Sequence, residues 1–476
     1  MNSTLIPNRT YTTEQLSFIE SDIKKSYILK ATAGSGKSQC AMERINFLLA
    51  NGIHPDKIIF FSYTTAAVEE FRSRIKNDAV KITTIHAFCL GMLAKMQKFK
   101  KIVDVYEFIN WYKEKFKPKS ESSPEVREEF YEAVTRMYDD AQFIGSAITA
   151  FKLQSADGIK SRLPKFYVEY KQFTKETKSR DFSDMLIEVR DLLKDNKWLR
   201  MFKNQYDYIF VDEFQDTSTI QMSILLALNA KYYTIIGDIS QSIFLYSGAN
   251  ADAIISMLKK RRTCEDMALS MNFRSAKMIV EHSNQYSDLK AVPFSQEDGI
   301  VHKHIVLFED LFKIIKKHPE VAILVRNNSM IKEIEKRMLL RKQPMRYFNY
   351  LTAQECDDLK KAKERPSTKK KVKALLPVYK TVDNIIEFIE ANKDCKVFAT
   401  SIHKSKGREF PVTVIVNCIS PELLQYNNLA ELDEETFNKI SFNPDGTSVE
   451  DFEAKNVFYV AVSRAKHELY FMLMDV

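Results

Sequence analysis

Short runs of apolar residues recur along the chain, and longer stretches with helix-like spacing of apolar positions separate them. Each run is short enough to be a buried strand, and polar residues follow at its carboxyl end. The alternation of such strands with helices predicts an α/β protein with parallel sheets. The expected strands are Tyr27–Lys30, Lys57–Ser62, Tyr208–Val211, Tyr232–Ile236, Val321–Val325, Val412–Val416 and Leu469–Leu473.

Between about residues 92 and 180 the pattern changes to amphipathic helices that are rich in lysine and aromatic residues, as in residues 99–111. This stretch predicts a helical insertion in the first α/β domain, and we expect a second α/β unit from about residue 276 onward. Within that unit, residues 360–373 are basic and contain a proline. We interpret them as a solvated loop, with a nucleic-acid-binding patch as the alternative.

Composition narrows the setting of the protein only slightly. The 476 residues carry a net charge of +8, which suits a polyanionic partner but is also common in ordinary globular proteins. The six cysteines form no Cys-x-x-Cys pair, so the sequence suggests neither a zinc nor an iron–sulfur site. The first residues do not resemble a signal peptide, and no apolar run is long enough to span a membrane. We therefore expect a cytoplasmic protein of a bacterial or phage-infected cell, with no membrane partner.

A candidate phosphate loop lies at residues 31–38, after the first expected strand and before a helical pattern, as this kind of site requires. Gly34 and Gly36 allow backbone N–H groups to close around phosphates. Lys37 is placed to reach the β- and γ-phosphates, and the Ser38 hydroxyl is placed to hold Mg²⁺. The loop therefore predicts ATP binding.

Two acidic residues, Asp212 and Glu213, follow the expected strand at 208–211. In a chain with a phosphate loop, we expect Asp212 to bind Mg²⁺ and Glu213 to activate the attacking water as a general base. Together with the loop, this acidic pair predicts ATP hydrolysis.

Another polar segment, residues 237–243, follows the next expected strand, and its Gln241 is a candidate sensor of the γ-phosphate. Two aromatic residues, Phe244 and Tyr246, come directly after it. Aromatic side chains near a nucleotide site can belong to the core or can stack on nucleic acid. From the residues alone we interpret them as core.

Taken in order, these motifs and several others resemble the superfamily 1 helicases of the UvrD/Rep/PcrA type, over nearly the whole chain. The other segments that carry the resemblance are Tyr11–Gln15, Ser62–Ala67, Thr84–Cys89, Asp181–Leu186, Leu269–Ser275, Thr400–Phe410 and Val457–Ala465. They are similar to the family's adenine-reading glutamine and to its T-F-T-N-K-A, T-F-H-S-F, D-F-D-D-L, L-x-x-N-Y-R-S, T-x-H-x-x-K-G-L-E-F and L-x-Y-V-A-x-T-R-A elements. The resemblance implies two RecA-like P-loop NTPase domains, called 1A and 2A. Domain 1A would comprise residues 1–92 and 179–275, with the helical insertion 1B at 93–178, and domain 2A would comprise residues 276–476.

The resemblance also implies roles for single residues. The implied ATP-binding set is Gln15, Ala33, Gly34, Ser35, Gly36, Lys37, Ser38, Phe273 and Glu409, in which Phe273 stacks on adenine and Glu409 contacts the ribose. The implied catalytic set is Lys37, Asp212, Glu213, Gln241, Arg274 and Arg464, whose arginines stabilise charge on the transferred phosphoryl group. Ser38 and Asp212 are the implied Mg²⁺ ligands. The implied DNA-binding set is Tyr63, Thr64, His86, Phe88, Tyr246, Thr400 and His403, in which Tyr63 and Tyr246 stack on bases.

The sequence departs from the family pattern at several positions. Thr65 and Ala66 replace the family's Asn-Lys, and Leu245 and Ser247 stand where relatives often carry arginines. Gln39 replaces an arginine that often packs on adenine. We expect these changes to weaken nucleotide or DNA affinity while leaving the hydrolytic set whole.

The stretch between the expected strand at 321–325 and Thr400 is short for this family. Full-length relatives carry a large helical accessory subdomain there, called 2B, which restrains unwinding by the monomer. We expect 2B to be absent or very small, with a lysine-rich segment at about 350–390 in its place. Because the chain ends directly after its last expected strand, we also expect it to lack the partner-binding tail and nuclease domain of some relatives.

The function implied by the resemblance is an ATP-dependent DNA helicase that uses ATP and Mg²⁺. It would move 3′→5′ on single-stranded DNA and unwind duplexes at single-strand/double-strand junctions, with replication or recombination proteins as candidate partners. One alternative is a translocase that strips proteins from single strands and unwinds poorly. Another is a catalytically idle DNA-binding scaffold, against which the intact hydrolytic set argues. An RNA motor also stays open, because the sequence has no clear sugar selector.

Overall fold

The computed structural model describes residues 10–75, 77, 79–244, 248–361, 366–420, 423, 427 and 449–474. The chain forms two compact units, one of Met1–Ala31 with Lys37–Leu269 and one of Thr32–Gly36 with Ser270–Val476. In the described part of the chain, no helix combines the length and apolar character needed to cross a membrane.

The first unit is built on a six-stranded parallel sheet with the order β3-β2-β4-β5-β1-β6. Its strands are β1 (Ser26–Ala31), β2 (Ile58–Ser62), β3 (Lys81–Thr84), β4 (Tyr208–Asp212), β5 (Tyr232–Gly237) and β6 (Cys264–Leu269). The helices of this part are α1 (Thr13–Ile19), α2 (Lys37–Ala50), α3 (Thr65–Arg74), α4 (Ile85–Lys95), α9 (Phe182–Leu192), α10 (Asn196–Phe202), α11 (Thr219–Ala227) and α12 (Ala251–Lys259).

Helices cover both faces of this sheet, so both faces are buried. Successive side chains of a strand point to opposite faces. Phe60 packs with α1, α2 and α3 in one core, whereas its neighbours Ile59 and Phe61 pack with α4, α9, α11 and α12 in another. This explains why the central strands are continuous apolar runs rather than alternating ones.

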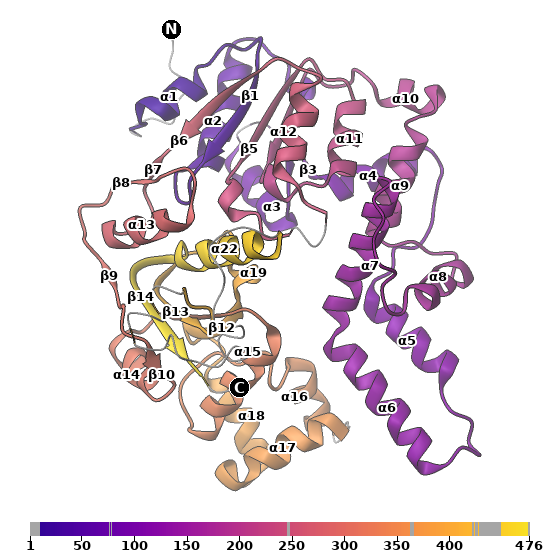
Figure 1. Ribbon diagram of the computed structural model, residues 1–476, viewed down its shortest axis with the longest axis vertical. Helices are drawn as coiled ribbons and strands as arrows, with labels where there is room; N and C mark the ends of the chain where they lie inside the picture. Colours follow the sequence, from indigo (N-terminus) through magenta and orange to yellow (C-terminus); the bar gives the residue numbers. More distant parts are fainter. Residues whose placement is uncertain are drawn as a thin grey trace. The chain divides into compact units, whose positions relative to one another are not determined.

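Four further helices of the first unit, α5 (Val105–Phe116), α6 (Pro124–Asp139), α7 (Ala141–Ala156) and α8 (Tyr167–Glu176), occupy the stretch expected to be a helical insertion (Figure 1). They have a core of their own, which includes Phe108, Ile109, Ile148, Tyr170 and Phe173. The chain enters this region after α4 and returns to the sheet through α9.

The second unit contains another parallel sheet with the order β10-β14-β13-β11-β12, and β9 pairs with β14. Its strands are β9 (Ile300–Val301), β10 (Val306–Leu307), β11 (Val321–Val325), β12 (Val397–Ser401), β13 (Phe410–Val416) and β14 (Ala465–Leu473); the short pair β7 (Met271–Asn272) and β8 (Val292–Pro293) lies apart from it. The helices are α13 (Lys277–Ser283), α14 (Asp310–Lys317), α15 (Asn328–Leu340), α16 (Ala353–Lys360), α17 (Pro366–Tyr379), α18 (Val382–Ala391), α19 (Ile402–Ser405) and α22 (Val449–Val462).

The predicted fold class and all seven expected strands are confirmed, but the interpretation of residues 360–373 as a loop is wrong. From Pro366 onward this segment is the first half of α17, and residues 362–365 lie outside the described part. Val372 and Leu375 are buried in the core of the second unit. The Nζ atom of Lys371 lies 2.7 Å from Oε1 of Glu355. In the sequence, the many lysines of this segment obscured the helical spacing of its apolar residues.

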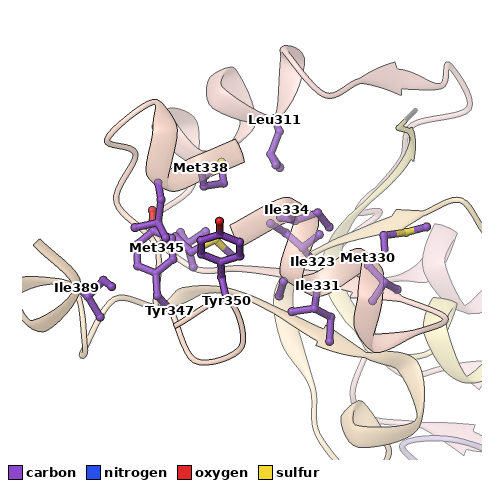
Figure 2. Close-up of a cluster of buried hydrophobic side chains, with 14 of the residues drawn as sticks. Leu311, Ile323, Met330, Ile331, Ile334, Met338, Met345, Tyr347, Tyr350 and Ile389 are labelled. Atoms are coloured by element: carbon purple, nitrogen blue, oxygen red, sulfur yellow. The ribbon is translucent and has the colours of Figure 1, made fainter. Parts of the chain in front are cut away.

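A buried carboxylate fixes the connection between α15 and α16. Glu335 is fully buried, and its Oε2 atom accepts hydrogen bonds from the backbone N–H groups of Asn349 (2.8 Å) and Tyr350 (2.7 Å). Its Oε1 atom accepts from the N–H of Phe348 (3.2 Å) and from the Asn349 side chain (2.8 Å). The turn that results directs Tyr347 and Tyr350 into the core, where Figure 2 shows them.

Replacing Glu335 by glutamine tests this role. Because both carboxylate oxygens face N–H donors, the NH₂ group of Glu335→Gln must oppose a donor, and we expect a loss of about 1–3 kcal/mol of unfolding free energy. Urea unfolding measures this value. The control is Glu333→Gln on the surface of the same helix, which should cost less than about 1 kcal/mol. Equal stability of the two variants would contradict the assigned role.

Candidate functional site

The phosphate loop has the backbone conformation that its glycines predict. Gly34 and Gly36 have φ angles of +71° and +76°, in the region that side chains disfavour. A Cβ atom at Gly34 would lie 2.7 Å from Cβ of Arg274 and 3.0 Å from Oδ1 of Asn272. Ser35 is buried, and its hydroxyl donates to the Thr32 carbonyl at 2.8 Å. The loop is therefore a tight cradle that only glycine allows at position 34.

Asn272, which the sequence reasoning did not assign, holds the loop to the segment that carries Phe273 and Arg274. Its side-chain nitrogen donates to the Ala33 carbonyl at 2.8 Å, and its oxygen accepts from the N–H groups of Arg274 (2.8 Å) and Ser275 (2.9 Å). The N–H of Phe273 donates to the Gly34 carbonyl at 3.0 Å. Its signal in the sequence is its match to the asparagine of the L-x-x-N-Y-R-S element.

In the first unit, the candidate catalytic groups lie at the carboxyl ends of the strands. Lys37 begins α2, and its Nζ atom lies 2.8 Å from Oε1 of Glu213, directly after β4. Burial lowers the pKa of Lys37, but the negative charges of Glu213 and Asp212 outweigh burial and raise it. Lys37 is therefore a cation at neutral pH and is already in contact with the candidate general base.

A chain of hydrogen bonds leads from Glu213 to Gln241. The buried Gln215 donates through Nε2 to the Glu213 carboxylate, and its Oε1 accepts from the Asp238 N–H at 3.2 Å. Gln241 then donates to Oδ2 of Asp238 at 2.7 Å. The predicted sensor is thus connected to the predicted base through two residues, Gln215 and Asp238, that had no assigned role.

The groups present suit a bound Mg²⁺–ATP. Asp212 ends β4, and Ser38 lies in the first turn of α2. A carboxylate and a hydroxyl are oxygen donors of the kind that Mg²⁺ prefers. The loop that precedes Ser38 has the positive φ angles at Gly34 and Gly36 that are typical of loops whose backbone N–H groups bind phosphates.

The residues expected near the base and sugar have mixed surroundings. Gln15 is buried, and its Oε1 accepts from the Thr12 N–H at 3.0 Å as part of the cap of α1. Phe273 is 39% exposed, and its ring centre lies 4.9 Å from that of Phe294. The Phe273 ring is therefore partly exposed and has one aromatic neighbour.

Glu409 and the two candidate arginine fingers have partners inside the second unit. Glu409 Oε2 accepts from Nε of Arg274 at 2.8 Å, and Oε1 accepts from Lys466 at 3.0 Å. Burial raises the pKa of Glu409, but the hydrogen bonds and charges of these two cations outweigh it and hold the pKa below its usual range. Arg464 is only 1% exposed and donates to the carbonyls of Val460 and Arg408 at 3.0 and 3.1 Å.

Two of the expected DNA-binding residues, Tyr63 and His86, line a pocket of about 300 Å³ in the first unit. Tyr63 is 39% exposed, and its ring stacks on Phe244 at 5.4 Å. His86 meets Phe182 edge to face at 5.2 Å, and burial lowers the pKa of His86, so its ring is neutral at pH 7. Phe182, which also lines the pocket, was not assigned, although it lies in the D-F-D-D-L-like segment.

The remaining members of the expected DNA-binding set have other surroundings. Thr64 caps α3 by accepting from the Ala67 N–H at 3.2 Å. Phe88 is 6% exposed and packs edge to face on Phe61 at 5.3 Å, so the structure gives its ring a core position. Thr400 is buried in β12, and His403 is half-buried in α19 of the second unit. Tyr246 lies outside the described residues.

A phosphate loop after β1 and an acidic pair after β4 of a parallel sheet are typical of the P-loop nucleotide-binding proteins. Residues 11–262 match the model of the UvrD/REP helicase N-terminal domain, and residues 351–475 match that of the UvrD-like helicase C-terminal domain. The chain belongs to the UvrD-like helicase family, as its motifs predicted.

Among curated proteins, the chain is 27% identical over 380 residues to a probable DNA helicase II homolog of Mycoplasma capricolum subsp. capricolum, covering 72% of this chain and 52% of that protein. It is 23% identical over 442 residues to the ATP-dependent DNA helicase PcrA of Staphylococcus epidermidis, covering 85% of this chain and 58% of that protein. The chain thus spans about half the length of the curated relatives it matches.

Gly237 tests the importance of the hydrogen bonds around Gln215. A Cβ atom at Gly237 would lie 2.1 Å from Oε1 of Gln215 and 2.9 Å from the Phe214 ring. We expect Gly237→Ala to displace Gln215 and to cost about 1–3 kcal/mol, measured by thermal unfolding. The control is Gly91→Ala in α4, where a Cβ atom meets nothing within 4 Å, so helix propensity should raise stability slightly. An unchanged melting temperature for Gly237→Ala would show that this packing is not needed.

Proposed function

We propose that this chain is an ATP-driven motor that moves 3′→5′ along single-stranded DNA and separates duplex strands. The observation that carries the proposal is that, in the first unit, the candidate ATP site lies directly beside the residues proposed to bind single-stranded DNA. Strands β2 and β4 pair with Phe61 opposite Val211, so Tyr63 and Asp212 follow at one sheet edge. Tyr63, His86, Asp212 and Gln221 line one small cavity of about 10 Å³.

The segment after β4 supplies a physical route for coupling these sites. It begins at Glu213 in the ATP site and continues through Gln215 to Asp216, Ser218 and Gln221, which line the 300 Å³ pocket. The side chain of Gln221 and the Ser218 backbone are joined by a hydrogen bond of 2.8 Å. Any shift of Glu213 during turnover therefore acts on a segment that also lines this 300 Å³ pocket, which we call the strand pocket because it would hold single-stranded DNA.

In the proposed ATPase step, phosphates compete with Glu213 for the ammonium group of Lys37. A Glu213 carboxylate released from its 2.8 Å contact can accept a proton from the attacking water. Ser38 and Asp212 would hold Mg²⁺, which neutralises phosphate charge when bound. Arg274 and Arg464 are the proposed groups that stabilise the charge developing on the transferred phosphoryl group.

The rest of the proposed nucleotide site follows the family resemblance. Gln15 would contact adenine, Phe273 would stack on it, and Glu409 would contact the ribose. The exposed ring of Phe273 supports its role. Residues 1–92 with 179–275 would act as domain 1A, residues 93–178 as 1B, and residues 276–476 as 2A.

The chain would hold single-stranded DNA by stacking aromatic side chains on its bases, which tolerates any base sequence. The partial exposure of Tyr63 supports its role as the stacking residue, and His86 with Phe182 would border the track. Thr64, Thr400, His403 and Tyr246 stay proposed contacts on the resemblance alone. Single-strand/duplex junctions are the proposed substrates, with replication or recombination proteins as proposed partners.

A translocase with weak unwinding is a second candidate function. The described residues between β11 and β12 form α15 to α18, and their buried side chains belong to the core of the second unit. This compact segment stands where the resemblance places the large accessory subdomain 2B. A motor without that subdomain could move on a strand and still separate a duplex poorly.

Strand separation on matched duplexes with a 3′ or a 5′ single-stranded tail tests the proposal. We expect ATP-dependent unwinding of the 3′-tailed duplex only, and we expect Lys37→Ala to abolish both ATP turnover and unwinding while it retains DNA binding. Unwinding of neither duplex, with DNA-stimulated ATP turnover intact, would favour the translocase. Normal turnover by Lys37→Ala would refute the assignment of the phosphate loop.

Tyr63→Ala tests the proposed stacking platform. Loss of stacking on one base is worth about 1–3 kcal/mol, so the DNA concentration for half-maximal stimulation of ATP turnover should rise roughly 5- to 150-fold. Turnover without DNA should change little. Tyr131→Ala is the control, because Tyr131 in α6 is exposed to a similar degree, at 46%, but does not line the pocket. Equal responses of the two variants would remove Tyr63 from the strand site.

A further inference from the structure

A buried lysine joins the helical insertion to the sheet-bearing part of the first unit. Lys152 of α7 is 8% exposed, and its Nζ atom lies 2.8 Å from Oδ2 of Asp181 and 2.8 Å from Oδ2 of Asp184. The hydroxyl of Tyr170, in α8, donates to the same Asp181 oxygen at 2.9 Å. These four side chains, the Lys152 cluster, take no part in the proposed chemistry of ATP.

The two aspartates of the Lys152 cluster form the start of α9. Asp181 caps this helix, and its Oδ1 accepts from the Asp184 N–H at 2.8 Å and from the Ser183 hydroxyl at 2.7 Å. The Asp184 side chain accepts in return from the Asp181 N–H at 3.3 Å. Lys152 and Tyr170 therefore clamp the first turn of α9 from the side of the insertion.

The first residue of α9 is Phe182, the aromatic neighbour of His86 in the strand pocket. One wall of this pocket comes from the insertion, with Val105 of α5 and Ile148 of α7. Tyr63, His86 and Phe182, from the sheet-bearing part, line the same pocket. The placement of α7 against α9 thus bears on the shape of the pocket. The Lys152 cluster is one polar contact between those helices, and Arg190 of α9, which donates to the Ala156 carbonyl at 3.0 Å and pairs with Asp157 at 3.4 Å, is another at the far end of α7.

Charge makes this contact sensitive to the loss of one partner. Burial raises the pKa of Asp181, but the charge and hydrogen bond of Lys152 outweigh it and lower the pKa. Burial and the charge of Asp181 raise the pKa of Asp184. Without Lys152, the buried Asp181 carboxylate and the partly exposed Asp184 carboxylate would remain close together without a cation, an arrangement that disfavours the observed packing.

We propose that Lys152 is a positioning residue, which holds α7 and α8 against the start of α9 so that the pocket between them fits single-stranded DNA. The proposal rests on the DNA-binding function proposed above. It gives the insertion a specific task in gripping the strand and assigns that task to one lysine of α7.

The test uses the full chain and an unstructured oligodeoxythymidine as the single strand. For Lys152→Met, we expect the DNA concentration that half-maximally stimulates ATP turnover to rise about tenfold or more, with turnover in the absence of DNA within about twofold of the original. Lys152→Arg, which keeps the charge, should recover most of the affinity. Tyr170→Phe removes only one hydroxyl and should give a smaller shift in the same direction.

Lys371→Met is the matched control, since Lys371 also pairs with a partly buried carboxylate but lies in the second unit. It should leave the DNA concentration dependence unchanged. If folded Lys152→Met and Tyr170→Phe both keep the DNA concentration dependence of the parent protein, the positioning role of Lys152 is overturned, while the proposed function stands. If Lys152→Met does not fold, the DNA concentration dependence of Tyr170→Phe and of Lys152→Arg decides whether Lys152 positions the pocket. A parent protein whose turnover and binding do not respond to DNA would overturn the proposed function, and this inference with it.

Discussion

The contact between Lys37 and Glu213 is the interaction on which the rest of the first unit's site depends. It joins the first residue of α2 to the residue that follows β4, at a distance of 2.8 Å. Glu213 reaches this position because its φ angle is +52°, which turns the chain sharply at the end of the strand. That turn lets Gln215 enter the core and places the following residues along the strand pocket. One backbone turn therefore organises both halves of the proposed motor site.

Polar groups are buried in this chain in two distinct ways. Glu335 and Arg464 are satisfied mainly by backbone N–H and carbonyl groups, which belong to fixed elements of the fold. Such groups hold a turn or a helix end in one position. Lys37 and Lys152 instead pair with carboxylate side chains. For Lys152 the pairing links two helices, whereas the proposed ATPase step needs phosphates to compete with Glu213 for Lys37.

The sequence predicted the central strands because each, like β4, is buried on both faces and so is a continuous apolar run. It did not predict β6, whose edge position leaves Glu265 and Asp266 exposed and breaks the apolar pattern. Charge also hid α17, because four lysines precede or interrupt the apolar residues of its first half. Local patterns thus revealed the continuous apolar strands and failed where polar residues interrupt the run, as in β6 and also in β12, whose five residues are all buried but include Thr400 and Ser401.

The same dependence on local sequence patterns explains which residues of the candidate site could be predicted. Lys37, Ser38, Asp212 and Glu213 were found because their chemistry requires adjacent residues directly after strands, and the structure places them there. Asn272, Gln215 and Lys152 were missed, since their importance depends on partners far away along the chain. Lys152 is the clearest case: as a lysine in a lysine-rich helical region it suggests a solvated surface. Only the folded chain brings it to two aspartates that cap another helix, and this turns an ordinary surface residue type into a buried link between the insertion and the strand pocket.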